Sequence, residues 1–514
     1  MRLQKASAAG HPRALAALTA AALAIATLVS PCGSGAAVAQ GSERGFDPAA
    51  WSADYALLKS ELEKSYSNLA WFASPQGGVD LPALDRRTKA LLAQARSDED
   101  ARLAIHDFVL SLHDGHFSEL PSLAAAAAEP AAEPAKRDLS HDDPRSACAA
   151  LGYADKSQVA FSLPFETLPQ FKLESDGVNS AFRAGLLTWN GARVGLVRIK
   201  NFSMRQYPSA CERTWTTSTK RERSGTAFDD LVTDTWFATL AAQLRRFHAE
   251  RVDILLVDVG SNSGGSDSGE WTPRLLSARP VRSARLLMSA APVAQAYFDE
   301  QIAATKSAQA ADPTAALQAK AQQSLAFFAA AAADLANRHC DMSWVWAEQR
   351  PFDPAGCSRL IDVGFASGAI AAMAPADYRD RRAAAKIYWP ATVDPWRAAW
   401  TGRVYVLTNA TSYSAAEMFA AIMQDNAIAK TVGVRTGGDG CGFMEETPPV
   451  VLPHSHLRFR MPNCVRLRAD GSSEVAGIAP DLPIAALEGE SARARAARLL
   501  SSIVADANSS VENK

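Results

Sequence analysis

The chain reads VYVLTNATSYSAAEMFAAIM from Val404 to Met423. Its first four residues are β-branched or aromatic and predict a buried strand. Helix formers with regularly spaced apolar residues follow from Ala415 and predict a helix. Ser414 therefore lies at a strand–turn–helix junction, where its hydroxyl and the free N–H of Ala415 point the same way. Acyl transfer requires this arrangement; the alternative is that Ser412 and Ser414 are ordinary N-cap serines.

A second buried strand is predicted from Val252 to Val259, and it ends in the loop GSNSGG, residues 260–265. Adjacent glycines such as Gly264 and Gly265 let the backbone approach a ligand closely and direct N–H groups toward it. An α/β core with parallel strands is indicated, because the helical pattern from Trp236 to Phe247 leads directly into this strand.

The chain resembles the family of tail-specific (C-terminal-processing) serine peptidases, which includes the tricorn core and the retinoid-binding repeats. The resemblance extends over residues 50–490 and implies a crotonase-like ββα core and peptide-bond hydrolysis through Ser414. It also implies an oxyanion hole formed by the N–H groups of Ala415 and of Gly264 or Gly265. Four motifs carry it, in family order: Leu112-His113-Asp114-Gly115-His116, then Asp258 with Asn262, Gly264 and Gly265, then Ser412-Tyr413-Ser414-Ala415-Ala416-Glu417, and finally Gly477-Ile478-Ala479-Pro480-Asp481.

The general base of the best-known members has no counterpart here. Bacterial tail-specific proteases use a lysine in a loop about 25 residues after the serine, and Asp439 occupies that place in the loop 435–440. The nearest lysine, Lys430, lies too early in the turn to reach Ser414. A serine–lysine dyad is therefore not expected.

The tricorn-like branch uses a histidine base and a glutamate instead, and His116 and Glu474 match them. A histidine can take the serine proton near neutral pH, provided that a carboxylate or a carbonyl fixes its tautomer. In the tricorn core a serine before the histidine helps to relay to the glutamate, and here Gly115 holds that position. For His116 two other roles stay open: capping of a helix C-terminus, or part of a metal site with His113.

The N-terminus has the pattern of an export signal. A basic segment precedes an apolar run from Leu15 to Val29, and Ala37-Val38-Ala39 is a cleavage site of the A-x-A type, so the mature chain is expected to begin at Gln40. The run is too short for a membrane anchor. We therefore expect a periplasmic or secreted protein with no stable membrane insertion.

Six cysteines remain after cleavage, an even number that favours disulfides in an oxidising compartment. Six cysteines allow 15 connectivities, and sequential pairing is the simplest. It joins Cys441 to Cys464 and staples the Asp439 loop to the strands that follow. Free buried thiols are the alternative.

Composition is that of a globular enzyme, with 48% hydrophobic residues, 21% charged residues and a formal net charge of −2. Nothing in this balance suggests nucleic-acid binding. We expect an α/β fold in five parts: a signal peptide (1–39), a helical region (40–120), an Ala/Pro-rich linker (121–146), the catalytic core (147–490) and a C-terminal helix and tail (491–514). Residues 159–171 and 185–202 read as strands of the core. A helical insert is expected at about 285–345, and we find no PDZ domain.

These observations predict an exported serine peptidase that acts on a peptide or protein substrate, with Ser414 as nucleophile, His116 as base and Glu474 as its orienting residue. We expect no metal and no other cofactor. Two alternatives stay open: an esterase, because the same acyl chemistry cleaves esters, and a non-catalytic protein of this fold that binds apolar ligands.

Overall fold

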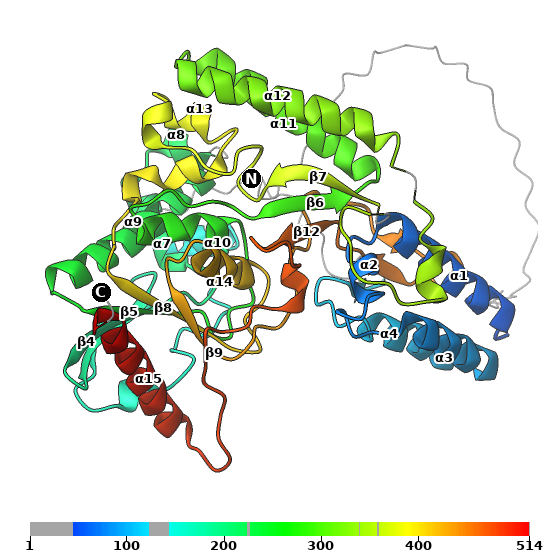
Figure 1. Cartoon of the computed structure of the whole chain (residues 1–514), viewed down its shortest axis with the longest axis horizontal. Helices are drawn as coiled ribbons and strands as arrows, with labels where there is room; N and C mark the ends of the chain where they lie inside the picture. Colours follow the sequence, from blue (N-terminus) through cyan, green and yellow to red (C-terminus); the bar gives the residue numbers. More distant parts are fainter. Residues whose placement is uncertain (1–44, 123–142, 224–226, 339, 357–358, 513–514) are drawn as a thin grey trace, which may run out of the picture.

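The computed structural model describes residues 45–122, 143–223, 227–338, 340–356 and 359–512 (Figure 1). The predicted signal peptide and most of the predicted Ala/Pro-rich linker lie outside these residues. No helix in the described ranges is long and apolar enough to cross a membrane.

A seven-stranded mixed sheet forms the centre of the molecule. Its middle strands β4, β5, β8 and β9 are parallel to one another, and β2 and β3 extend one edge as antiparallel strands. The α/β class predicted from the sequence is therefore confirmed. In spatial order the strands are β13 (Leu482–Pro483), β9 (Lys430–Gly433), β8 (Arg403–Thr408), β5 (Ile254–Asp258), β4 (Ala192–Arg198), β3 (Arg183–Trp189) and β2 (Lys172–Asp176).

Helices cover both faces of this sheet. Successive side chains of a strand point to opposite faces, and both faces of the central strands carry apolar side chains. In β8, Val404 and Val406 join the core under α9 and α14, whereas Tyr405 and Leu407 pack against the C-terminal helix α15. The helices of this layer and its surroundings are α6 (Pro144–Ala150), α7 (Pro208–Thr217), α8 (Lys220–Arg223), α9 (Ala227–Ala249), α10 (Ser268–Trp271), α14 (Ala415–Asp425) and α15 (Ala492–Glu512).

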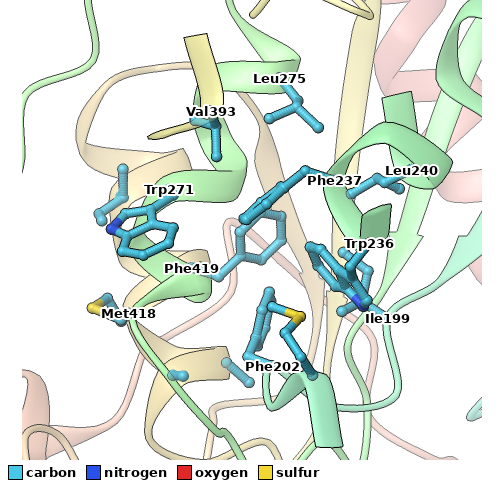
Figure 2. Close-up of a cluster of buried hydrophobic side chains, with 14 of the residues drawn as sticks. Ile199, Phe202, Trp236, Phe237, Leu240, Trp271, Leu275, Val393, Met418 and Phe419 are labelled. Carbon is cyan, nitrogen blue, oxygen red and sulfur yellow. The ribbon is translucent and has the colours of Figure 1, made fainter. Parts of the chain in front are cut away.

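The largest core cluster fixes α14, the helix that begins after Ser414. Phe419 of α14 is fully buried and its ring contacts that of Phe202. Figure 2 shows both rings among side chains from α9, α10 and the segments around them. The labelled members are Ile199, Phe202, Trp236, Phe237, Leu240, Trp271, Leu275, Val393, Met418 and Phe419.

The N-terminal helices form a second core with strands from the far end of the chain. Strand β1 (Ser118–Leu120) pairs antiparallel with β11 (Arg458–Arg460), which pairs with β10 (Val450–Val451). In Figure 1 the blue helices and the orange strands lie together at one side of the molecule. This pairing brings the residues just before β1 close to the central sheet. The helices are α1 (Pro48–Ser65), α2 (Leu69–Phe72), α3 (Leu81–Gln94) and α4 (Asp98–Leu110).

A small antiparallel sheet lies above the central one and carries two long helices. Its order is β12 (Cys464–Leu467), β6 (Arg285–Ser289) and β7 (Leu360–Phe365). Helices α11 (Pro292–Ala311) and α12 (Ala315–Leu335) connect β6 to β7 and pack on each other, while the short α13 (Arg381–Ala384) follows β7. Both long helices lie within the segment predicted as a helical insert, although the domain boundaries stay predictions.

Two disulfides follow the sequential pairing expected from the sequence. Cys148 is bonded to Cys211, and Cys441 to Cys464, with Cα–Cα separations of 5.9 and 5.5 Å. Cys340 is disulfide-bonded as well, whereas Cys357 lies outside the described residues. The second bridge ties the segment after the Asp439 loop to the first residue of β12.

One predicted strand was wrong. Residues 159–171 form no strand, and their apolar side chains fill the core under α15 from a chain of turns. The reason is a competing set of hydrogen bonds: the backbone N–H and the hydroxyl of Ser162 both donate to the Asp258 carboxylate, at 2.6 and 2.7 Å. Phe165 then opens a 3-10 turn.

Candidate active site

Ser414 occupies the predicted junction between β8 and α14. Its backbone angles, φ 54° and ψ −116°, are a conformation that residues with a side chain rarely adopt. Such a sharp turn lifts the serine hydroxyl clear of the sheet, as in other strand-to-helix nucleophile turns. Its backbone N–H donates to the carboxylate of Glu417 at 3.0 Å, which stabilises the turn.

His116 comes from the N-terminal helical region, two residues before β1, and reaches Ser414 across the molecule. Its Nε2 lies 3.1 Å from Ser414 Oγ, and its Nδ1 lies 3.2 Å from the backbone carbonyl oxygen of Asp439. A carbonyl can only accept a hydrogen bond, so Nδ1 carries the proton and Nε2 is left to accept from the serine. This is the tautomer that a general base requires.

The loop that supplies this carbonyl is held by one buried carboxylate, that of Glu417. It accepts hydrogen bonds from Thr436 Oγ1 and from the N–H groups of Gly438, Asp439 and Gly440, over 2.7 to 3.1 Å. Burial raises the pKa of Glu417 to about 7, while these donors pull it down. Glu417 therefore connects the serine turn to the loop that orients His116.

A second buried carboxylate, Asp114, lies behind the imidazole. It accepts from the Tyr66 hydroxyl at 2.7 Å, from Asn68 Nδ2 at 3.1 Å and from the backbone N–H of His116 at 3.0 Å. Its Oδ1 is 3.8 Å from His116 Nδ1. Burial raises the pKa of Asp114 above its ordinary value, and a positive charge on His116 and the three donors offset only part of that rise.

The two expected oxyanion donors in the glycine loop differ in availability. The N–H of Gly264 donates to Asn262 Oδ1 at 2.8 Å, whereas the N–H groups of Gly265 and Ala415 make no hydrogen bond within the described ranges. The backbone of Gly264 nevertheless passes against the nucleophile, because a Cβ placed there would lie 2.6 Å from Ser414 Cβ. Gly265 and Ala415 are therefore the donors that remain for an oxyanion.

Glu474 does not contact His116, contrary to the simplest form of the sequence prediction. Its Oε2 accepts from Arg466 Nε at 2.7 Å, and Arg466 in turn donates to the Gly440 carbonyl at 2.8 Å. Both side chains of this ion pair are buried, at 8% and 0% exposure. A buried carboxylate needs a counter-charge, and Arg466 of β12 provides it. Glu474 thus supports the loop next to the carbonyl that His116 contacts.

Asp114, His116 and Asp439 offer three potential metal ligands, whose atoms lie within 4.8 Å of one another. Hydrogen bonds already engage two of these groups, because Asp114 accepts the three bonds described above and Asp439 Oδ1 accepts from the N–H of Gly115 at 2.9 Å. His116 Nε2 faces Ser414. This donor set therefore fits a hydrogen-bonded catalytic cluster better than a cation. His113, the other histidine considered for a metal, is exposed and absent from the cluster.

Sequence reasoning missed three residues of this site. Asp114 and Glu417 both lie inside motifs quoted for the family resemblance, so their positions were available although their contacts were not. Arg466 had no signal, because its pairing with Glu474 depends on how β12 meets the turn that follows it.

Part of the chain is similar to a known peptidase family. Residues 348–484 match the model of peptidase family S41. The matched segment contains Ser414, Glu417, the Asp439 loop and Glu474, and the match is consistent with the predicted resemblance to tail-specific proteases. No curated protein matches the chain significantly.

Solved structures of the protein CPAF have the same fold. Mature CPAF complexed with lactacystin is 15% identical, covers 89% of this chain and 97% of its own, and gives a TM-score of 0.54. Mature CPAF alone gives 0.52, at 15% identity over 89% of this chain and 96% of its own.

The packing of His116 leads to a first prediction. A Cβ at Gly442 would lie 2.5 Å from His116 Cδ2, so Gly442→Ala should push the imidazole away from Ser414. We expect kcat/KM to fall on the order of 10²-fold, as for a displacement of about 1 Å in a catalytic group, with little change in melting temperature. Gly45→Ala is the control, because nothing lies within 4 Å of its Cβ position. An unchanged rate in Gly442→Ala would contradict the observed packing.

Proposed function

We propose that this chain, a serine peptidase of the S41 type, hydrolyses peptide bonds through an acyl-enzyme intermediate formed on Ser414. The observation that carries the proposal is the contact between Ser414 Oγ and His116 Nε2 at 3.1 Å, with Nδ1 turned toward a carbonyl. A serine is a weak nucleophile by itself and needs such a neighbouring base.

The chemical steps follow from these positions. His116 takes the proton of Ser414 as the hydroxyl attacks the substrate carbonyl, and the N–H groups of Ala415 and Gly265 stabilise the oxyanion. His116 then gives the proton to the leaving amine, and the acyl-enzyme remains on Ser414. In the second half-reaction His116 activates a water, which releases the acid and regenerates the serine.

Glu474 acts in this proposal through other groups. Its ion pair with Arg466 fixes the Gly440 carbonyl, and the adjacent carbonyl of Asp439 receives the His116 N–H. Glu474 therefore orients the base indirectly, by stabilising the loop, and does not share its proton.

Export is the second part of the proposal. The two disulfides between described cysteines are compatible with an oxidising compartment, where such bonds persist. Together with the signal pattern of residues 1–39, they favour a mature enzyme that works in the periplasm or outside the cell.

The nucleophile is tested by removing its hydroxyl. Ser414→Ala should abolish both labelling by a fluorophosphonate probe and cleavage of peptide and ester substrates, because no acyl-enzyme can form. Ser412→Ala is the matched control: its buried hydroxyl donates to the Val259 carbonyl at 2.8 Å and accepts from the Asn409 N–H at 3.1 Å, so its loss should cost about 1–3 kcal/mol of stability and leave labelling at Ser414. Labelling that persists in Ser414→Ala would overturn the assignment.

The base is tested by pH. A protonated histidine cannot accept the serine proton, so activity should fall on acidification as His116 becomes charged. His116→Ala should lower kcat on the order of 10³-fold or more. Full activity in that variant, or a profile that is flat down to pH 5, would direct attention to another base.

Export is tested by secretion from a bacterial host. The mature chain should begin at Gln40, and its six cysteines should show no free thiol after denaturation, because all are expected to be paired. N-terminal sequencing and thiol titration measure the two properties. An uncleaved N-terminus or six titratable thiols would contradict this part of the proposal.

A further inference from the structure

We propose that Asp114 is the positioning residue whose negative charge supports His116 during catalysis, a role that the sequence prediction gave to Glu474. The inference rests on the proposed function, because it concerns the base of that same site.

The first argument is that two groups near His116 Nδ1, the Asp439 carbonyl and the Asp114 carboxylate, have different roles. The Asp439 carbonyl, at 3.2 Å, receives the N–H and so fixes the tautomer. A carbonyl has no net charge, however, and His116 becomes an imidazolium once it takes the serine proton. The carboxylate of Asp114, 3.8 Å from Nδ1, can stabilise that positive charge without accepting a proton.

The environment of Asp114 is the second argument. Its side chain is 0% exposed, so water does not screen its charge. Donors from Tyr66, Asn68 and the backbone of His116 itself fix the carboxylate in place and favour its ionised form. The short connection through Gly115 gives the histidine and its carboxylate a common position in the fold.

The other acidic groups near the imidazole are each engaged elsewhere. The carboxylate of Asp439 accepts from the N–H of Gly115, and the residue as a whole is less buried than Asp114. Glu417 accepts five hydrogen bonds, four of them from the loop and one from Ser414.

The positive charges facing His116 are also engaged. Arg466 is paired with Glu474, which leaves that pair neutral as seen from the imidazole. The Phe443 ring meets the His116 ring edge-on. Arg460 in turn stacks on Phe443, with its Cζ 3.6 Å from the centroid of the Phe443 ring. Asp114 is therefore the buried negative charge best placed to act on His116.

The test compares three isosteric variants of the full mature chain: Asp114→Asn, Asp439→Asn and Glu474→Gln. For each, kcat, KM and the rate of fluorophosphonate labelling are measured from pH 5 to 9. Asp114→Asn should lower kcat on the order of 10²-fold, less than the ~10⁴-fold seen when a triad aspartate also fixes the tautomer. The acidic limb is the part of the pH–activity profile in which kcat falls on acidification, and its midpoint should move about one unit toward lower pH. KM should stay within about twofold.

The other variants should behave differently. Asp439→Asn should move the limb by less than half as much, because Asp439 is less buried than Asp114. Glu474→Gln should lower kcat through a looser loop but leave the limb in place. A structural role alone would change the rate and the melting temperature and would leave the limb in place. Glu417 titrates in the same range but is unchanged in all three variants, so differences between their limbs report on the altered residue.

Tyr66→Phe gives a second reading if Asp114→Asn does not fold. It removes one donor from Asp114 and keeps the charge, which then attracts a proton on His116 more strongly. The acidic limb should therefore move to higher pH, opposite to its shift in Asp114→Asn.

Three results would overturn the inference: an unchanged limb in Asp114→Asn, a larger shift in Glu474→Gln, or activity that EDTA removes and zinc restores. In the first two cases the proposed function survives if Ser414→Ala and His116→Ala are inactive, whereas the third would also remove His116 as the base of the proposed function. If those two variants remain active, the proposed function itself fails.

Discussion

The carboxylate of Glu417 joins the parts of the site to one another. It lies one helical turn after Ser414, accepts the serine's own N–H, and accepts four more hydrogen bonds from Thr436 and the glycine-rich loop that follows it. A buried carboxylate without such donors would cost several kcal/mol. The strained turn at Ser414 and the position of the Asp439 carbonyl are therefore parts of one hydrogen-bonded unit.

The second constraint is the contact between the two ends of the chain. Strand β1 pairs with β11, and the N-terminal helices share a core with residues beyond position 340. This packing positions His116 relative to the sheet that holds Ser414. The glycines at the contact allow the close approach: a Cβ at Gly115 would lie 2.5 Å from the Asp439 carboxylate, so larger residues would separate the two halves of the site.

The sequence was sufficient where chemistry depends on local pattern. The junction at Ser414 followed from a β-branched run next to helix formers, and the Cys441–Cys464 bridge from simple sequential order. The partner of Glu474 was not predictable, because Arg466 reaches it only after β12 has paired with β6. The segment 159–171 has strand-like apolar spacing, yet it forms turns, because the N–H and the hydroxyl of Ser162 donate hydrogen bonds to the Asp258 carboxylate. Long-range polar contacts of this kind leave no periodic trace in the chain.

The distance along the chain between the two reacting side chains has a consequence for the life history of the protein. His116 and Ser414 are 298 residues apart in the sequence, so they meet only after the last strands have joined the first helices. The site is therefore complete only in a chain that has been synthesised beyond Arg460 and in which β1 has paired with β11.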